Sequence, residues 1–166
     1  ADSGMVQEDN MKMSYDNYAH QFLDEKNYEK AEEYFKKAGN IEGLIDVWFK
    51  TEEYDKAIEL IEKIPEENEL LLILGNKFEK YGLCDEAVKC YTTALSISLG
   101  RNKELVCKAY YRLAVLYDEA DDTENALRYY KKNYTTSSEY RYNKYYSVSL
   151  TNSAIILYEQ NETSEA

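Results

Sequence analysis

Residues 27–40 read NYEKAEEYFKKAGN, and this stretch decides the fold of the 166-residue chain. It predicts a short helix over 28–38, closed by Gly39, with Ala31 and Phe35 on one helix face. A small residue at that place lets a neighbouring helix lie close. The same pair, a small residue four positions before a large apolar one, returns at Ala57 and Ile61, Ala87 and Tyr91, and Ala126 and Tyr130. The chain is therefore predicted to be a helical repeat.

Each of these four anchor alanines follows another amphipathic segment. Helix pairs are predicted over 12–25 and 28–38, 41–50 and 54–64, 68–81 and 84–98, and 103–120 and 123–134. The polar run 135–138 should end the fourth pair, and a last helix should span 140–158. Residues 1–11 are expected to be flexible, the first four being an expression remnant, and 12–166 to form a single domain.

The register of the pairs supports the repeat. Twelve residues before the anchor alanines stand Ala19, Ile45, Gly75 and Ala114, and three positions after these stand Phe22, Trp48, Phe78 and Tyr117. Ala154 and Leu157 occupy the same places in the last helix, and Ala166 lies twelve residues beyond Ala154. We therefore predict about four and a half repeats, with the chain ending inside a fifth.

The composition narrows the class of partner. The chain has 32 acidic and 20 basic residues and a net charge of −12, so it should repel nucleic acid and anionic lipid. A basic protein partner fits that charge; the alternative is that acidic faces only maintain solubility. No apolar run is long enough for direct membrane insertion. Of the three cysteines, Cys84 and Cys90 fall near packing positions and predict core residues in a reducing, cytoplasmic compartment.

The second helix of each pair resembles the tetratricopeptide repeat. Tyr28, Ala31, Phe35 and Ala38 match the pattern Tyr-x-x-Ala-x-x-x-Tyr/Phe-x-x-Ala at all four places. The resemblance implies an all-α fold of antiparallel helix-turn-helix repeats, stacked as a right-handed α-solenoid that binds proteins or peptides in its concave groove. The anchor spacings of 26, 30, 39 and 40 depart from the 34 residues usual for this repeat.

A narrower resemblance covers residues 28–91. The stretches YFKKAGN at 34–40, IPEE at 64–67 and YGLCDEAV at 81–88 are similar to the helical region of WD-repeat-bearing intraflagellar transport complex A subunits. That similarity implies a scaffold in a multi-subunit ciliary transport complex. Residues 94–134 are closer to the long repeats of adaptor proteins that grip peptides. The alternative function is therefore a peptide-binding regulatory or sensor module.

The repeat register also predicts which side chains face the groove. They are Asp16, His20, Asp24, Glu42, Asp46, Phe49, Leu72, Asn76, Lys80, Tyr111, Val115 and Asp118. The carboxylates in the first two pairs predict a basic or amphipathic partner segment there. The chaperone-tail clamp of the resembled family uses Lys, Asn and Arg, which only Asn76 and Lys80 match, so we predict that an acidic chaperone tail is not the ligand.

Nothing in the sequence predicts catalysis or a cofactor. His20 is the only histidine, no cysteine cluster accompanies it, and no phosphate-binding loop or zinc motif occurs, so no enzyme and no metal site are predicted. A tyrosine cluster, consisting of Tyr140, Tyr142, Tyr145 and Tyr146, has two interpretations of equal weight. It forms either an interface with a partner or a cover over the fourth helix pair.

Overall fold

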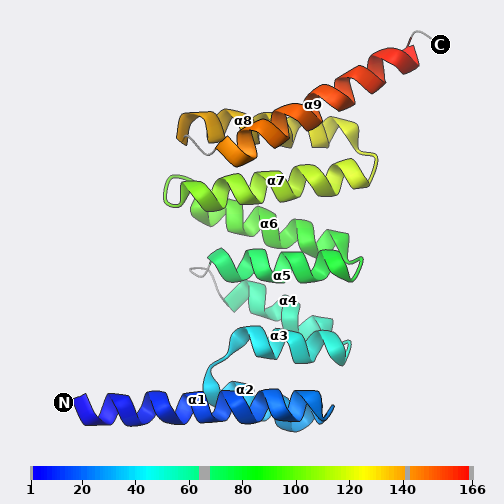
Figure 1. The fold of residues 1–166 in the computed structure, drawn as a ribbon. Helices are drawn as coiled ribbons and strands as arrows, with labels where there is room; N and C mark the ends of the chain where they lie inside the picture. Colours follow the sequence, from blue (N-terminus) through cyan, green and yellow to red (C-terminus); the bar gives the residue numbers. More distant parts are fainter. Residues whose placement is uncertain (1, 64–67, 141–142, 165–166) are drawn as a thin grey trace. The chain divides into compact units, whose positions relative to one another are not determined.

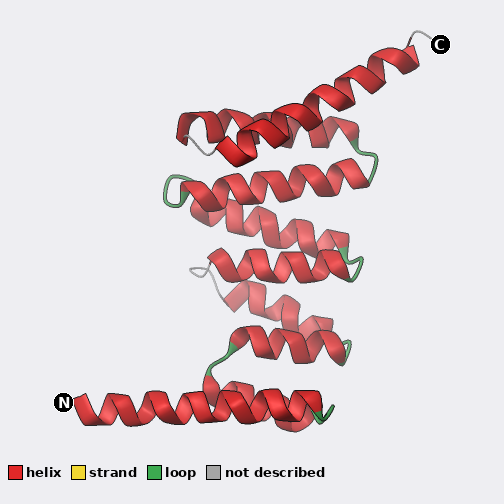
Figure 2. Cartoon of the chain, viewed as in Figure 1, coloured by secondary structure: helices red, strands yellow, loops and turns green. Residues whose placement is uncertain are grey.

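The structure is a computed structural model that describes residues 2–63, 68–140 and 143–164. Every regular element in these ranges is an α-helix (Figures 1 and 2). The chain forms two compact units, Ala1–Lys63 and Ile64–Ala166. The predicted all-α helical-repeat fold is confirmed, whereas the single domain predicted from residue 12 onward stays a prediction.

Unit 1 consists of α1 (Asp2–Asp24), α2 (Tyr28–Ala38), α3 (Ile41–Lys50) and α4 (Tyr54–Lys63). Each helix packs on the next along the chain, and α1 also contacts α3. Ala19 of α1 and Ala31 of α2 are fully buried in one apolar cluster with Phe35 and Val47. The small residues of the repeat therefore form the close helix contact that the sequence predicts.

Unit 2 consists of α5 (Asn68–Lys80), α6 (Cys84–Ser98), α7 (Lys103–Glu119), α8 (Thr123–Tyr140) and α9 (Asn143–Ser164). Consecutive helices pack together, and α7 also contacts both α5 and α9. The anchor alanines Ala87 and Ala126 are fully buried, as are Ala114 and Tyr91. The helices α5, α7 and α9, each the first helix of a pair and called first helices below, thus lie side by side.

The turn inside each pair has one geometry, repeated four times. A residue five positions before the anchor alanine takes a left-handed conformation, with φ between 58° and 74°. The next N–H donates to a carbonyl five residues earlier, at 2.8–2.9 Å, which is the bonding of a Schellman C-cap. The left-handed residues are Lys26, Glu52, Gly82 and Asp121, and the acceptors are Phe22, Trp48, Phe78 and Tyr117. The register found in the sequence therefore corresponds to a repeated backbone motif.

Two glycines allow an aromatic ring to touch the backbone of a first helix. A Cβ placed on Gly75 of α5 would lie 2.5 Å from Cε1 of Tyr91 on α6. Gly43 of α3 is in equally close contact with the ring of Phe35 on α2. Both rings are fully buried, so each glycine is required by packing rather than by a turn.

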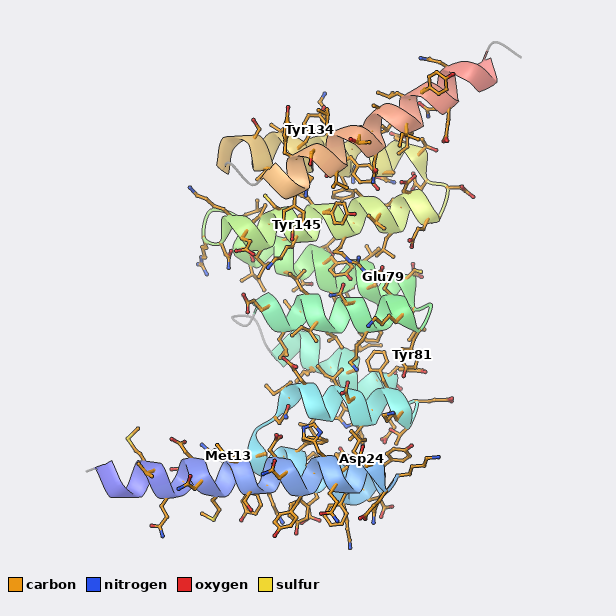
Figure 3. The ribbon with its side chains drawn as sticks, viewed as in Figure 1. Met13, Asp24, Glu79, Tyr81, Tyr134 and Tyr145 are labelled. Carbon is orange, nitrogen blue, oxygen red and sulfur yellow. The ribbon has the colours of Figure 1, made fainter. Side chains whose placement is uncertain are left out.

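The N-terminal helix begins earlier than the sequence predicts. It starts at Asp2 rather than Lys12, and the side chains of residues 4–14 are exposed. Met5 and Met13 on this extension are 69% and 65% exposed (Figure 3 labels Met13). These residues extend the helix without contributing to the core. The predicted flexibility of residues 1–11 stays a prediction.

The predicted break at residues 135–138 is wrong, because α8 continues to Tyr140. Two hydroxyl groups of this run form hydrogen bonds within α8. Thr135 Oγ1 donates to the Lys131 carbonyl at 2.8 Å, and Ser137 is fully buried, its Oγ donating to Asn133 Oδ1 at 3.1 Å. The last helix correspondingly starts at Asn143 rather than residue 140.

Asn133 connects three helices through buried polar contacts. Its Nδ2 donates to the Cys107 carbonyl of α7, and its Oδ1 accepts from Ser149 Oγ of α9 at 3.1 Å as well as from Ser137. Its other two partners are serine side chains, which a search for apolar periodicity in the sequence does not detect. The network fixes the position of α9 on α8.

Three packing predictions are wrong within the described residues. Cys84 is exposed because it is the first residue of α6, whereas Cys90 and Cys107 are buried. Ala154 is exposed and Leu157 is 51% exposed, since α9 buries Ser149, Ser153 and Ile156 instead. The IPEE stretch at 64–67 and Ala166 lie outside the described residues.

Candidate functional site

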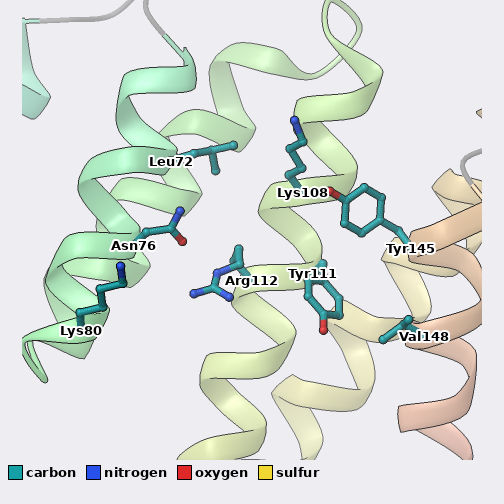
Figure 4. Close-up of a pocket in the computed structure, with 8 residues that line it drawn as sticks. All are labelled: Leu72, Asn76, Lys80, Lys108, Tyr111, Arg112, Tyr145 and Val148. Atoms are coloured by element: carbon teal, nitrogen blue, oxygen red, sulfur yellow. The ribbon is translucent and has the colours of Figure 1, made fainter. Parts of the chain in front are cut away.

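A pocket of about 480 Å³ opens between the three first helices of unit 2, a size typical of ligand sites. Side chains of α5 face those of α7 across it, and two side chains of α9 close one side (Figure 4). The lining residues are Leu72, Asn76 and Lys80 of α5, Lys108, Tyr111 and Arg112 of α7, and Tyr145 and Val148 of α9. Three of the eight are cations and none is a carboxylate.

A hydrogen-bonded network fixes one wall of the pocket. The Tyr91 hydroxyl of α6 lies 2.7 Å from Asn76 Oδ1 and 2.9 Å from Glu79 Oε2. Arg112 pairs with Glu79 (labelled in Figure 3), and its Nε donates to the Tyr91 oxygen at 3.4 Å. Burial raises the pKa of Tyr91 well above its ordinary value, so the hydroxyl keeps its proton at neutral pH. Asn76 and Arg112 are therefore held in place before any ligand arrives.

The other two cations of the pocket are bonded differently. Lys108 Nζ lies 2.7 Å from Glu104 Oε1, and this bond raises the pKa of Lys108. Lys80 is exposed and makes no ion pair with any residue in the described part of the chain. Lys80 is thus the lining cation most available to a ligand.

Six of the predicted groove residues lie in unit 2, and four of them line the pocket. Leu72, Asn76, Lys80 and Tyr111 meet there. Asp118 instead accepts a hydrogen bond from Tyr130 Oη at 3.1 Å within the fourth helix pair, and Val115 is partly buried away from the pocket lining. Whether a partner binds at these residues stays a prediction.

The six predicted groove residues of unit 1 differ in their exposure and bonding, and whether a partner binds at them stays a prediction. Phe49 is wrong as a groove residue, because it is only 2% exposed and its ring packs against Tyr54 at 5.3 Å. Asp16 is engaged inside the unit, where Oδ1 accepts from Asn40 Nδ2 at 2.6 Å. His20 Nε2 lies 3.5 Å from Asp16 Oδ2, and its ring makes a T-shaped contact with that of Phe35. Asp24 and Glu42 are exposed and Asp46 is half-buried.

Three pocket residues were missed by the sequence reasoning, namely Lys108, Arg112 and Val148. Lys108 lies three residues before Tyr111 and four before Arg112, so helical spacing from Tyr111 could have found Lys108, and spacing from Lys108 could have found Arg112. Val148 carried no signal, because its position depends on how α9 packs on α8.

The tyrosine cluster is divided between pocket and surface. Tyr145 lines the pocket with its ring 5.8 Å from that of Tyr111, and burial raises its pKa. Tyr146 is 38% exposed and lies 6.4 Å from the ring of Tyr134 (Figure 3 labels Tyr134 and Tyr145). The Tyr140 side chain and Tyr142 lie outside the described part of the chain. Both predicted interpretations of the cluster therefore stay open for those two.

In a second cluster of charged residues, in unit 1, the charged side chains pair with one another. Glu32 accepts from Trp48 Nε1 at 3.0 Å and pairs with Lys36 at 2.9 Å and Lys56 at 3.2 Å. Burial by itself would raise the pKa of Glu32, but these hydrogen bonds lower it to about 2. The cluster ties α2 to α3 and α4 and offers no unpaired group to a ligand.

Neither a metal site nor a membrane span is found where the structure describes the chain. No group of three or more His, Cys, Asp or Glu side chains is placed to hold a metal ion in the described ranges. No described helix combines the length and the apolar character that crossing a bilayer requires.

Comparison with known proteins finds a family match in each of the two units. The tetratricopeptide repeat family model matches residues 14–41, in unit 1, and 108–134, in unit 2. No curated protein sequence matches the chain significantly. Tetratricopeptide repeats point generally to protein–protein interaction. The two matches and the all-helical fold together support a tetratricopeptide-repeat-like protein.

Proposed function

We propose that this chain is a non-enzymatic protein-interaction module that binds a partner segment in the pocket between α5, α7 and α9. The observation that carries the proposal is the pocket itself, which is formed only by first helices and lined by both apolar and hydrogen-bonding side chains. A small number of fixed polar groups in an otherwise apolar cleft is typical of ligand sites. The geometry favours the peptide-binding alternative over a purely structural scaffold.

The scaffold remains the second candidate because of one observation on α9. Leu150, Ile155 and Tyr158 are 42–65% exposed and line one shallow hollow on the surface of α9. An apolar face of that kind suits a constitutive neighbour in a larger assembly. The intraflagellar transport role, with its cytoplasmic and ciliary location, rests on the sequence similarity of residues 28–91 and stays a prediction.

Photo-crosslinking from two positions on α9 separates the candidates. Val148 lines the pocket and is 38% exposed, whereas Leu150, which is 42% exposed, lies outside it. Benzoylphenylalanine would replace either residue in the full chain, and crosslinked partners would be mapped by mass spectrometry. Crosslinks from Val148 alone would support the groove function, and crosslinks from Leu150 alone would favour the scaffold. If neither position yielded a specific crosslink, the proposed function would be wrong.

A further inference from the structure

We propose that a second copy of this chain docks on α9, so that an aromatic face of α1 and α2 in one copy packs into the hollow on α9 of the next copy. The inference goes beyond the proposed function, because it names the partner of a different surface and does not depend on the pocket between α5, α7 and α9. Its evidence is an exposed apolar surface in each unit and the match in shape and charge between the two surfaces.

The first surface is the hollow on α9, which measures about 530 Å³ and is lined mainly by apolar side chains. Leu150, Ala154 and Tyr158 line it at intervals of four residues, so they share one face of the helix. Leu150 is 42% exposed and Tyr158 is 65% exposed. The chain therefore leaves a continuous apolar stripe of α9 in contact with solvent.

The polarity of α9 is the reverse of what a helix at a free surface normally shows. Its buried residues include Ser149 and Ser153, whereas its exposed residues include leucine, isoleucine and tyrosine side chains. An amphipathic surface helix places its polar residues in solvent and its apolar residues toward the core. An exposed apolar patch is typical of a protein interface, so we expect another molecule to cover this face of α9.

The second surface, called the aromatic face here, is formed by four rings of unit 1. The ring of Tyr34 on α2 lies 5.3–6.0 Å from three rings of α1, those of Tyr15, Tyr18 and Phe22. Tyr18 is 50% exposed. The residue after Tyr34 is Phe35, which packs on Gly43 of α3, so the aromatic face lies on a different side of α2 from that contact.

The two surfaces complement each other in shape and in charge. Tyr18 is half exposed on the aromatic face, and the hollow is large enough to receive its ring. Lys30 Nζ lies 5.1 Å from the centre of the Phe22 ring and gives the aromatic face a positive charge. Glu159 is the one charged residue among the described residues that line the hollow. Docking would therefore bring Lys30 of one copy toward Glu159 of the next.

The charges also favour this arrangement over a symmetric pair. If two α9 hollows faced each other, their described lining residues would offer no cation to Glu159. A contact between two different surfaces leaves each pair of copies with one further surface of each kind available. It can therefore repeat and join more than two copies.

Sedimentation velocity of the full chain over a series of concentrations measures the association. The salt concentration should be about 0.15 M, because the net charge of −12 makes copies repel one another at low ionic strength. Tyr18→Glu and Tyr158→Glu should each raise the dissociation constant about thirtyfold, the effect of losing one central interface residue. The matched control is Tyr81→Glu, which adds the same charge at a tyrosine that is also 50% exposed but lies in neither surface (Figure 3). It should leave the association unchanged.

Mixing the two variants tests whether different surfaces meet. Tyr18→Glu and Tyr158→Glu should each be monomeric alone, whereas an equimolar mixture should form a one-to-one dimer, because each variant keeps the surface that the other lacks. Lys30→Glu and Glu159→Lys should each weaken association about threefold, and the two changes in one chain should restore it.

Circular dichroism melting verifies that each variant is folded, and Tyr18→Gln replaces Tyr18→Glu should the added charge destabilise unit 1. A chain that stays monomeric up to about 1 mM would overturn the proposal. So would a Tyr18→Glu variant that still associates as the wild type does, since that result indicates a symmetric contact through α9. Each of these results leaves the pocket function intact, because none of the substituted residues lines that pocket.

Discussion

Replacing Gly75 with alanine tests the contact that joins the fold to the pocket. The new Cβ would lie 2.5 Å from Tyr91 Cε1, whereas carbon atoms in contact are normally about 3.5–4.0 Å apart. The Tyr91 ring is fully buried and cannot move into solvent. It must shift by about 1 Å within the core, or α5 must move away from α6. Either shift also displaces the hydroxyl that orients Asn76.

The expected cost follows from three contributions. Overpacking of this kind costs about 1–3 kcal/mol, and weakening one hydrogen bond of Tyr91 costs about 1 kcal/mol. The higher helix propensity of alanine returns about 1 kcal/mol. The free energy of unfolding should therefore fall by about 2 kcal/mol, which lowers Tm by about 4–8 °C for a chain of this size.

Thermal and urea unfolding followed by far-UV circular dichroism measures this change. Gly4→Ala is the control, because a Cβ at Gly4 would have no neighbour within 4 Å. It should leave stability unchanged or slightly higher. A Gly75→Ala variant that melts at or above the wild-type temperature would refute the packing argument. The same variant should also bind a partner segment in the pocket more weakly.

Three further outcomes are expected from the charged, polar and sulfur-containing groups. The folded-state pKa of Glu32 is lowered to about 2, so the stability that Glu32 contributes is present above its ordinary pKa of about 4.5 and is lost as pH falls toward 2. Glu32→Gln should make the free energy of unfolding depend less on pH in this range, as measured by urea titrations followed by Trp48 fluorescence. Asn133→Ala should lower the free energy of unfolding by about 2–3 kcal/mol, measured by calorimetry, because it leaves the buried groups bonded to Asn133 without that partner. An unchanged stability would contradict the role of Asn133 in positioning α9. Cys84 alone should react with a thiol reagent in the native protein, because Cys90 and Cys107 are buried. Burial also raises the pKa of both buried thiols, to about 12 for Cys90. Rapid reaction of all three cysteines would contradict the fold.

The helix pairs could be predicted from sequence because their signals are local. An alanine followed four residues later by an aromatic side chain marks a buried helix face at Ala31, Ala87 and Ala126, which are all fully buried. The same pair at Ala154 and Tyr158 is exposed, so the pattern alone does not decide burial. Where Gly39 and Gly82 take positive φ, the predicted helix ends were correct for 28–38 and one residue too long for 68–81. The end of α8 was missed because serine and threonine are polar in a pattern but can bond inside a helix, as Ser137 does with Asn133.

The pocket was only half predictable, for a different reason. Leu72, Asn76, Lys80 and Tyr111 followed from the repeat register, because each lies on a first helix at a fixed offset from a small residue. Whether such a side chain meets solvent depends on its neighbours, and Phe49, which lies four residues after Ile45 on its own first helix, is buried.

The sequence alone determined the helical repeat, its register and the acidic surface, since periodicity and charge are properties of the chain itself. Only the tertiary structure decided which cations share a pocket and which are already paired. Arg112 and Glu79 are 33 residues apart and meet because α5 and α7 lie side by side. A contact of that kind depends on the packing of whole helices, and no local pattern records it.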